Sequence, residues 1–519
     1  TDSWVIDNIL NYKNTFGKHS IDLTAVATRD RKKYEMVETT GSNFAANGNT
    51  TLGINGLHKA TVQKVNMDNN QRSNIGYLGR ASYSYDDRYF FTGSYRRDGA
   101  SVFGVNQKWG DFFAFGGAWR LSSEKFMSSI SYLDDLKLKL SWGKNGNQGL
   151  DPYGTLSTIN NGASGGVRYE FGGSDIIYGL NQKALGNANL GWETTESWNT
   201  GFESAWLGSR LFVDLDLYFS KTTDQIFTRD IPVMTGFKNM KSSMGQVNNR
   251  GVELTIRSVN VDTRDWHWMT NLTFWLNRNK LIHLYGEDLD GDGREDDDIS
   301  NSRFIGKSLG AIYGYQQDGI VQESDVEYMK ANGATPGIPK YKDIDNDGVI
   351  TSADRVILGY STPNFKLNMS NTITYKNWDL YFMLTGTFGG GGYYQKSNKS
   401  AYLTNGSSRF NTNGIYIPWW TPENKSNEYP AATFNGDGGR FLGLQNRAFV
   451  RLQDVTLSYT FREPWVQKAN IQNLKVFFTA KNLFTITKWQ GGDPEVGVTV
   501  SENTYPVLTS FSLGANISF

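Results

Sequence analysis

The sequence predicts an all-β protein: a transmembrane antiparallel β-barrel, of which about fifteen strands lie in these 519 residues. Three observations predict it. Segments of about ten residues alternate apolar and polar side chains, short and long connections follow one another along the chain, and the composition favours strands. Aromatic residues make up 14% of the chain and 56 residues are glycine, whereas only 11 are proline. This composition is typical of strands joined by tight turns, with aromatic side chains at a membrane interface.

The alternation is clearest in residues 210–220 (RLFVDLDLYFS), where every second residue is apolar and Asp214 and Asp216 lie between. Residues 74–85 and 365–375 show the same period. A strand with lipid on one face and a wet lumen on the other has this pattern. A strand of a soluble β-sandwich has it too, so alternation alone leaves both architectures open.

Connection lengths separate the two architectures, because outer-membrane barrels have short periplasmic turns at one end and long external loops at the other. Short connections are expected at residues 17–19, 86–88, 133–135, 208–209, 262–265 and 376–377. Long connections are expected at residues 41–72, 99–111, 146–190, 228–246, 285–360, 389–444 and 488–508. Residues 462–473 fit less well, because they should form a short turn and are longer. A sandwich has no reason to gather its long loops at one end, so the barrel is favoured.

The strands expected between these connections number about fifteen. They are residues 5–16, 20–38, 73–86, 89–98, 112–121, 136–145, 192–207, 210–227, 246–261, 266–284, 364–376, 378–388, 445–461, 474–487 and 509–519. Bacterial single-chain barrels have an even number of strands. The odd count predicts that residues 1–519 are the C-terminal part of a barrel, with an upstream stretch supplying the remaining strands.

Composition and charge exclude several functions. The chain has no cysteine, which removes disulfides, thiolate zinc sites and cysteine nucleophiles. Basic and acidic residues number 52 each, so no overall charge favours nucleic acid. No apolar run approaches the roughly 20 residues of a spanning helix. The first residues lack the features of a signal peptide, so we expect that a leader was removed or that the start is absent.

Residues 343–354 (DIDNDGVITSAD) match a calcium-binding loop within the long external loop 285–360. Acidic residues stand at positions 1, 3 and 5, glycine at 6 and aspartate at 12. The expected ligands are Asp343, Asp345, Asp347, the backbone carbonyl of Val349, Thr351 and Asp354. Aspartate in place of glutamate at position 12 weakens the expected bidentate closure. The loop predicts a structural calcium ion that stiffens the external loop; the alternative is a solvated acidic turn.

A second acidic run, residues 288–298 (DLDGDGREDDD), begins in the same way but has Ile299 at position 12. A solvated charge run and a degenerate calcium site are equally consistent with it.

The sequence offers little for catalysis, and we expect no enzyme. The four histidines lack the paired spacing of a metal site. Residues 162–166 and 306–310 fit Gly-x-Ser-x-Gly but lie in long loops, without the strand-to-helix setting of a nucleophile elbow. The glycine run 389–392 lacks the Lys-Ser/Thr of a phosphate loop and indicates a flexible strand exit.

Aromatic residues in the long connection 389–444 are candidates for substrate contact, above all Tyr416, Trp419 and Trp420. Such rings stack on sugars or pack on peptide side chains. Aromatic residues near barrel ends are also what an interfacial girdle needs, and this explanation is favoured over substrate contact. Glycan and peptide therefore both remain open as substrates.

The last residues, 512–519 (SLGANISF), alternate apolar and polar residues and end in Phe519. They resemble the C-terminal signal that barrel-assembly machinery reads in outer-membrane proteins.

Several segments resemble the SusC/RagA family of TonB-dependent transporters of Bacteroidetes. In chain order they are residues 95–104 (YRRDGASVFG), 116–119 with Glu124 and Phe126, 138–146 (LKLSWGKNG), 187–196 (NANLGWETTE), 248–254 (NNRGVEL), 311–320 (AIYGYQQDGI), 450–460 (VRLQDVTLSYT) and 480–495 (AKNLFTITKWQGGDPE). The resemblance runs from near Tyr95 to the end of the chain. Each segment is modest alone, but the ordered set is specific.

The resemblance implies nutrient import across the outer membrane of a Gram-negative bacterium. It implies a 22-stranded barrel with an N-terminal plug, a surface lipoprotein of the SusD kind as a lid, and energy from the TonB complex. No plug and no TonB box are visible in this sequence, so about seven strands and the plug are expected elsewhere. The partners implied are that N-terminal part, the lipoprotein, TonB and outer-membrane lipid, and no nucleic acid.

Two other functions are weighed against import. One is a scaffold or assembly component of a larger outer-membrane complex. The other is a secreted, calcium-stabilised β-sandwich that acts as an adhesin or on glycans, which solubility without detergent would favour.

Overall fold

A computed structural model gives the fold of the chain. It describes residues 1–44, 50–161, 168–170, 176–237, 239–288, 290–392, 418–431, 434, 444–489, 493–495 and 507–519. None of the helices in these ranges is long and apolar enough to cross a membrane.

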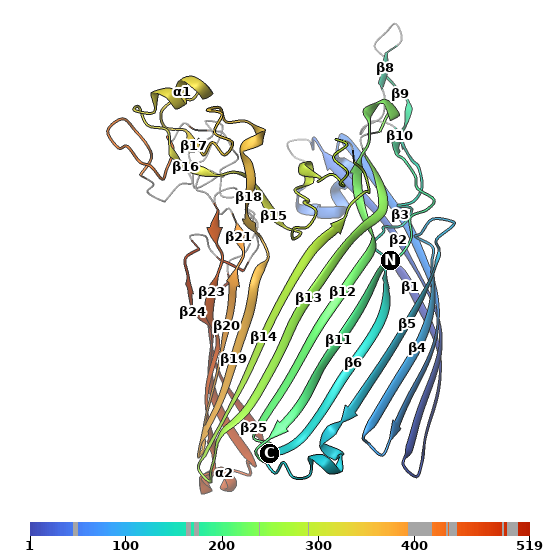
Figure 1. The fold of residues 1–519 in the computed structure, drawn as a ribbon, viewed down its shortest axis with the longest axis vertical. Coiled ribbons are helices and arrows are strands. Elements are labelled where there is room, and N and C mark those ends of the chain that lie inside the picture. Colours follow the sequence, from blue (N-terminus) through green and yellow to red (C-terminus); the bar gives the residue numbers. More distant parts are fainter. Residues whose placement is uncertain are drawn as a thin grey trace.

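In the part of the chain that the structure describes, fifteen strands form one antiparallel sheet (Figure 1), and each of them pairs with the members of this sheet that precede and follow it in the sequence. They are β1 (Asp2–Phe16), β2 (His19–Ser42), β3 (Val62–Tyr85), β4 (Tyr89–Ala100), β5 (Trp109–Arg120), β6 (Leu133–Asn147), β11 (Glu193–Trp206), β12 (Leu211–Asp230), β13 (Asn239–Asp262), β14 (Trp266–His283), β19 (Pro363–Tyr375), β20 (Trp378–Gly389), β23 (Phe449–Phe461), β24 (Asn473–Thr487) and β25 (Ser510–Ser518). The sheet confirms the prediction of an all-β barrel fold with about fifteen strands in this chain.

Short strands and helices occupy the connections. Paired strands are β7 (Thr158–Asn161) with β10 (Leu180–Ala184), β8 (Arg168–Glu170) with β9 (Ile176–Tyr178), β15 (Ala311–Tyr315) with β18 (Arg355–Tyr360), β16 (Gln317–Ile320) with β17 (Pro339–Tyr341), and β21 (Gly391–Gly392) with β22 (Gln445–Asn446). The α-helices are α1 (Val326–Asn332) and α2 (Pro464–Lys468). Turns of 3₁₀ helix are η1 (Thr50–Lys59), η2 (Leu121–Ser123), η3 (Lys125–Met127), η4 (Val233–Thr235), η5 (Ile299–Asn301) and η6 (Ser352–Asp354).

The long connections gather at one end of the sheet and the short turns at the other (Figure 1). This arrangement agrees with the predicted separation of external loops from periplasmic turns. The turn between β19 and β20, for example, contains only Lys376 and Asn377. Its Lys376 adopts a φ of 53°, the left-handed conformation that a two-residue hairpin needs.

Three predicted connections differ from the structure. Residues 62–72 of the predicted connection 41–72 belong to β3, whose ladder with β2 continues to the Ser42–Val62 pair. Residues 133–135 belong to β6, and the periplasmic connection before it is residues 121–132, which contain η2 and η3. Residues 228–246 are mostly strand, because the β12–β13 ladder continues to the Asp230–Asn239 pair. Beyond the membrane neither face meets lipid, so the apolar alternation stops while the backbone pairing continues.

The strands carry different side chains on their two faces. On one face the Lys139 ammonium lies 2.9 Å from Asp214 Oδ1 and 3.1 Å from Asp216 Oδ2. Because side chains alternate along a strand, Leu215 and Leu217 lie on the opposite face. We assign the charged face to the lumen and the apolar face to lipid.

Aromatic side chains on the lipid-facing side form two bands. The band near the periplasmic turns contains the ring pairs Tyr85–Tyr89, Tyr89–Trp119, Tyr132–Trp206, Trp266–Tyr375 and Trp378–Tyr459. The band near the external loops contains Tyr95–Phe113, Phe115–Trp142, Trp142–Trp198, Phe274–Phe365 and Phe365–Phe388. Trp378 and Phe388 stand about ten residues apart on one strand, the length that a tilted strand needs to cross a bilayer.

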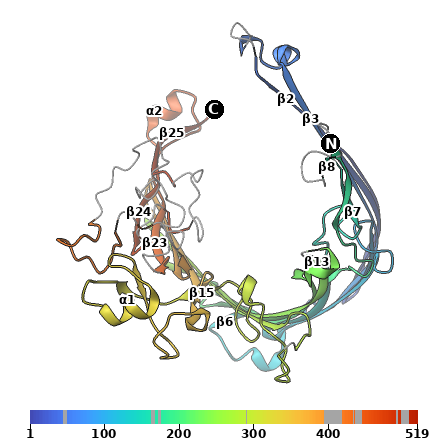
Figure 2. The same ribbon diagram turned by 90° about the horizontal axis from the view of Figure 1, so that it is seen from above.

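The sheet curves into an open arc when seen from above (Figure 2). Among the described residues, the edge strands β1 and β25 each pair with one neighbour only, β2 and β24 respectively.

The two faces can be tested with adjacent residues of β13. Leu254→Arg places a charge on the lipid face near mid-membrane, where it should reduce the free energy of unfolding by about 2–4 kcal/mol. Thr255→Arg places the same charge on the lumen face, opposite Asp214 in the ladder, and should cost less than about 1 kcal/mol. Urea titration of the full-length protein in lipid vesicles measures both. Equal losses would contradict the assignment of the faces.

Candidate functional site

Two external loops pack together into one folded unit, which we call the outer subdomain and define as residues 311–360 and 418–431. The Ala431 N–H donates to Gly337 O at 2.7 Å, and the Ile320 N–H donates to Asn427 Oδ1 at 3.0 Å. Ile320 and Val321 are fully enclosed. The two loops therefore share a small hydrophobic core above the barrel wall.

Trp420 belongs to that core. Its side chain is 8% exposed, and its indole N–H donates to Gln322 Oε1 at 3.0 Å. A Cβ on Gly337 would lie 2.6 Å from the Trp420 ring, so glycine is needed there for the ring to pack. Trp420 thus joins the two loops, a role that the sequence did not indicate.

The other two predicted substrate contacts differ from Trp420. Trp419 is half-buried, and its backbone carbonyl accepts a hydrogen bond from Asn424 Nδ2 at 2.6 Å. Tyr416 lies outside the described residues. Contact of these three aromatic residues with a substrate stays a prediction.

The predicted calcium loop lies in the outer subdomain between β17 and β18. The carboxylates of Asp343, Asp345 and Asp354 each offer an oxygen, and these oxygens lie within 4.8 Å of one another. Asp354 is fully enclosed, and its carboxylate accepts the N–H groups of Ile344 and Thr351, both at 2.7 Å. The first, third and twelfth positions of the predicted motif therefore converge.

The remaining predicted ligands are arranged differently. Asp347 Oδ1 accepts the Val349 N–H at 2.8 Å, and Asp347 is outside the converging group. The Thr351 hydroxyl caps η6 by accepting the Ala353 N–H at 3.2 Å. Gly348 has a φ of 87°, which explains the glycine at the sixth position.

Electrostatics within this loop favour a cation. A hydrogen bond from the Asp347 N–H lowers the pKa of Asp345, but burial and the nearby carboxylates of Asp347 and Asp354 outweigh it, so the pKa is raised overall. In contrast, hydrogen bonds from the N–H groups of Thr351 and Ile344 hold the pKa of Asp354 below its usual range. The loop therefore holds Asp345, whose carboxylate is repelled by its neighbours, beside Asp354, whose carboxylate is held ionised. Carboxylate oxygens of this kind are the donors that calcium prefers.

The second acidic run folds like the first. Asp288 accepts N–H groups three and five residues ahead, from Gly291 at 2.7 Å and Gly293 at 2.9 Å. Asp343 does the same with Asn346 and Gly348, both at 2.7 Å. In the second run Asp296, and not the twelfth residue, converges with Asp288 and Asp290. Both interpretations of this run stay predictions.

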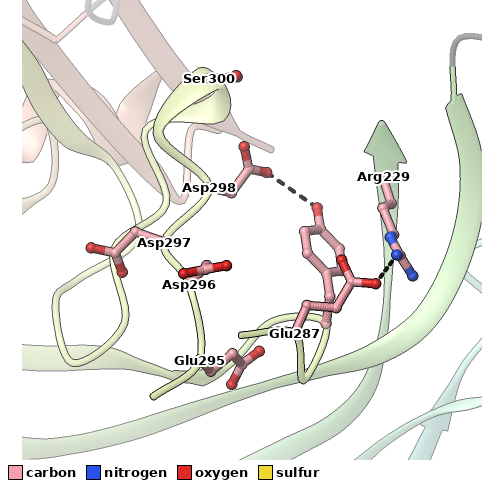
Figure 3. A pocket seen from close by; sticks show the side chains of 8 residues that line it. Arg229, Glu287, Glu295, Asp296, Asp297, Asp298 and Ser300 are labelled. Carbon is pink, nitrogen blue, oxygen red and sulfur yellow. Dashed lines mark hydrogen bonds and ion pairs between the residues drawn. The ribbon is translucent and has the colours of Figure 1, made fainter. Parts of the chain in front are cut away.

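A cavity of about 180 Å³ adjoins the second run (Figure 3). Its walls carry Glu287, Glu295, Asp296, Asp297 and Asp298, and Arg229 from β12 forms an ion pair with Glu287. The Tyr285 hydroxyl donates to Asp298 at 3.1 Å. These contacts hold the start of the loop 284–362 against the end of β12.

Sequence reasoning missed a buried ion pair at the external end of β23. Arg451 donates to Asp493 at 2.6 Å and to Glu495 at 2.8 Å, with the Arg451 and Asp493 side chains about 5% and 4% exposed. The Arg447 guanidinium donates to Pro494 O at 3.0 Å. The motif 480–495 was noticed for its family resemblance, but nothing in the sequence identified its ionic partner.

Side chains of one Gly-x-Ser-x-Gly match and of two histidines form contacts within the protein. The Ser308 hydroxyl, in one Gly-x-Ser-x-Gly match, donates to Asn279 Oδ1 at 2.8 Å. The other match, residues 162–166, lies outside the described residues. His267 contacts Asp262 at 2.6 Å in a periplasmic turn, and His283 contacts Glu295 at 3.2 Å.

A sheet with one apolar and one charged face, two aromatic bands and long loops at one end defines an outer-membrane β-barrel protein. The family model described as TonB dependent receptor-like, beta-barrel matches residues 1–483. The chain belongs to this family, and the family consists of receptors and transporters, which confirms the prediction that the protein is not an enzyme.

Curated relatives of the chain support this family membership. TonB-dependent receptor P3 of Formosa agariphila is 27% identical over 538 residues, covering 100% of this chain and 52% of that protein. TonB-dependent receptor SusC of Bacteroides thetaiotaomicron is 30% identical over 478 residues, covering 89% of this chain and 45% of that protein. The chain thus spans about half the length of the curated relatives it matches. The resemblance to SusC and the outer-membrane location are confirmed.

A solved structure shows the same fold. The RagAB peptide transporter matches with a TM-score of 0.81 and 21% identity, covering 100% of this chain and 55% of that one. The resemblance to RagA therefore extends to the three-dimensional arrangement of the strands.

Proposed function

We propose that the protein imports a nutrient actively across the outer membrane, as the barrel wall of a SusC-like TonB-dependent transporter. The family membership carries this proposal. The charged and hydroxyl-rich lumen face supports it, because a polar lumen suits a water-soluble cargo. The size and packing of the outer subdomain also support it, because external loops are where such proteins present binding groups.

The proposal includes further protein at both sheet edges. Unpaired N–H and C=O groups of β1 and β25 are costly in lipid, so additional strands must pair with them. About seven strands and a plug would complete a 22-stranded barrel, supplied by the N-terminal part of the longer protein. That part would connect to TonB, and a SusD-like lipoprotein would cover the external loops.

The cargo is proposed as an oligosaccharide or a peptide. The name of the RagAB structure supports a peptide for that protein, and aromatic residues in the external loops suit either class.

Uptake by a deletion strain tests import. We expect loss of growth on one cargo class, oligosaccharides or peptides, at concentrations that sustain the parent strain, with rescue by the full-length gene. Uptake in the parent should stop when the TonB complex is removed. If the deletion strain takes up both classes at the parent's rate, the import proposal is wrong.

We propose also that residues 343–354 bind one structural calcium ion through Asp343, Asp345 and Asp354. The converging oxygens and the enclosed Asp354 support this ligand set. The ion would link β17 to β18 and would also hold α1, because the Ile350 N–H donates to Asn332 Oδ1 at 2.6 Å. Its role is to stiffen the outer subdomain.

Asp345→Asn tests the calcium site by removing one ligand charge. Isothermal titration of the full-length protein with calcium should show one binding event fewer than in the wild type. Glu327→Gln, an exposed charge removal on α1, should leave the titration unchanged. At about 100 times the dissociation constant, calcium should stabilise the wild type by about 2.7 kcal/mol. The proposal fails if Asp345→Asn and Glu327→Gln give the same titration.

A further inference from the structure

An uncharged polar surface covers the lumen face of neighbouring strands in the middle of the sheet, β6, β11, β12, β13 and β14 (Figure 1). Side chains of these strands stand opposite one another in two adjacent rows. We call this surface the amide patch and define it by the residues of the two rows. The first row holds Ser141, Asn199, Tyr218, Gly251 and Asn277, and the second holds Gly143, Ser197, Ser220, Asn249 and Asn279.

The amide patch lies at the external end of the lumen. Ser141 stands two residues after Lys139, and Tyr218 two residues after Asp216, so both share the charged face that we assign to the lumen. Trp142 follows Ser141 on the opposite face and belongs to the external aromatic band. A ligand that enters from outside the cell therefore reaches the amide patch before the periplasmic half of the lumen.

Tyr218 forms a flat platform within the amide patch. A Cβ on Gly251, its partner in the ladder, would lie 2.3 Å from Tyr218 Cζ, so the ring lies directly over the glycine backbone. The Tyr218 hydroxyl donates to Asn277 Oδ1 at 3.0 Å and fixes the ring there. Because one face of the ring is turned to the wall, the other is turned to the lumen. An aromatic face of this kind stacks on a sugar ring.

Polar groups with spare hydrogen-bonding capacity surround this platform. Asn277 Nδ2 donates to Asn249 Oδ1 at 3.3 Å, which leaves the Asn249 Nδ2 group to donate elsewhere. Asn199, the other ladder partner of Tyr218, is exposed, and its side chain has no hydrogen-bond partner among the described residues. Amide groups both donate and accept hydrogen bonds, as sugar hydroxyls do. The amide patch therefore matches the surface of a hydroxyl-rich ligand.

The amide patch offers no counter-charge to an ionic ligand. The adjacent row on its periplasmic side holds Lys139, Asp216 and Glu253, and the Lys139 ammonium lies 3.1 Å from Asp216 Oδ2. Glu253 is exposed and has no ion-pair partner among the described residues. On β19, Lys366 lies over the Trp275 ring, 5.9 Å from its centroid. An anionic sugar or a charged peptide terminus on the amide patch would lose hydration without compensation.

We propose that the amide patch binds an uncharged oligosaccharide on its way into the lumen. One sugar ring stacks on Tyr218, and its hydroxyls exchange hydrogen bonds with Asn199 and Asn249. The site rests on the proposed function, because it is a step of the import path. It also selects one of the two cargo classes given above, a neutral oligosaccharide and not a peptide.

Binding of the purified full-length protein in detergent to an array of immobilised ligands tests the site. The probes are neutral oligosaccharides, oligosaccharides that carry uronate or sulfate groups, and short peptides. We expect the strongest retention on neutral oligosaccharides. Equal or stronger retention on either of the other two classes, or no retention on any neutral oligosaccharide, would overturn the proposal.

Variants locate the binding on the amide patch. Tyr218→Ala removes the platform and should weaken binding of the retained oligosaccharide about tenfold, whereas Tyr218→Phe keeps the ring and should stay within about twofold of the wild type. Asn199→Asp places a charge beside the ring and should also weaken binding about tenfold. Asn70→Asp, the same change on the lumen face of β3, should bind like the wild type. Wild-type binding by Tyr218→Ala and Asn199→Asp would overturn the proposal.

The binding site and the import function can fail separately. If the wild type binds neutral oligosaccharides but the deletion strain takes them up at the parent's rate, import of this cargo is wrong and the site stands. If the deletion strain loses uptake of peptides and the purified protein binds no neutral oligosaccharide, the site is wrong and import stands.

Discussion

The barrel wall of this molecule depends on the requirement that backbone N–H and C=O groups in a bilayer pair within the protein. An antiparallel ladder that runs without interruption from β1 to β25 meets this requirement for every strand except the two at the edges. It also forces side chains to alternate between lipid and lumen. The leucines of β12 and the Lys139 cluster on its other face both follow from that single constraint.

The ladder leaves the external loops free to form structures of their own. They are outside the bilayer, where water satisfies exposed backbone groups and side chains can form polar sites. Three arrangements stiffen the described loops: the Trp420 core, the turns made by Asp343 and Asp354, and the buried Arg451–Asp493 pair. Each joins segments that would otherwise move independently, and a rigid rim is what a binding surface at the mouth of a transporter needs.

The sequence predicted the strands that cross the bilayer, whereas several segments and contacts outside the bilayer were not predicted. The fifteen strands were predicted because lipid contact imposes a period of two on their side chains. The upper parts of the β2–β3 and β12–β13 ladders were missed because this alternation stops above the membrane. The convergence of Asp343, Asp345 and Asp354 followed from local spacing. The burial of Trp420 could not be predicted, because it depends on Gly337 and Gln322, which lie far away in the chain. The ionic partner of Arg451 stayed hidden for the same reason.

We propose that this sheet is most of one barrel wall, closed by strands from the rest of a longer protein. A structure of the full-length protein in lipid tests it most directly, by the number of strands between β25 and β1. We predict about seven strands there, making a closed barrel of 22 whose lumen holds a plug. Direct pairing of β1 with β25, or two edges left open to lipid, would contradict it.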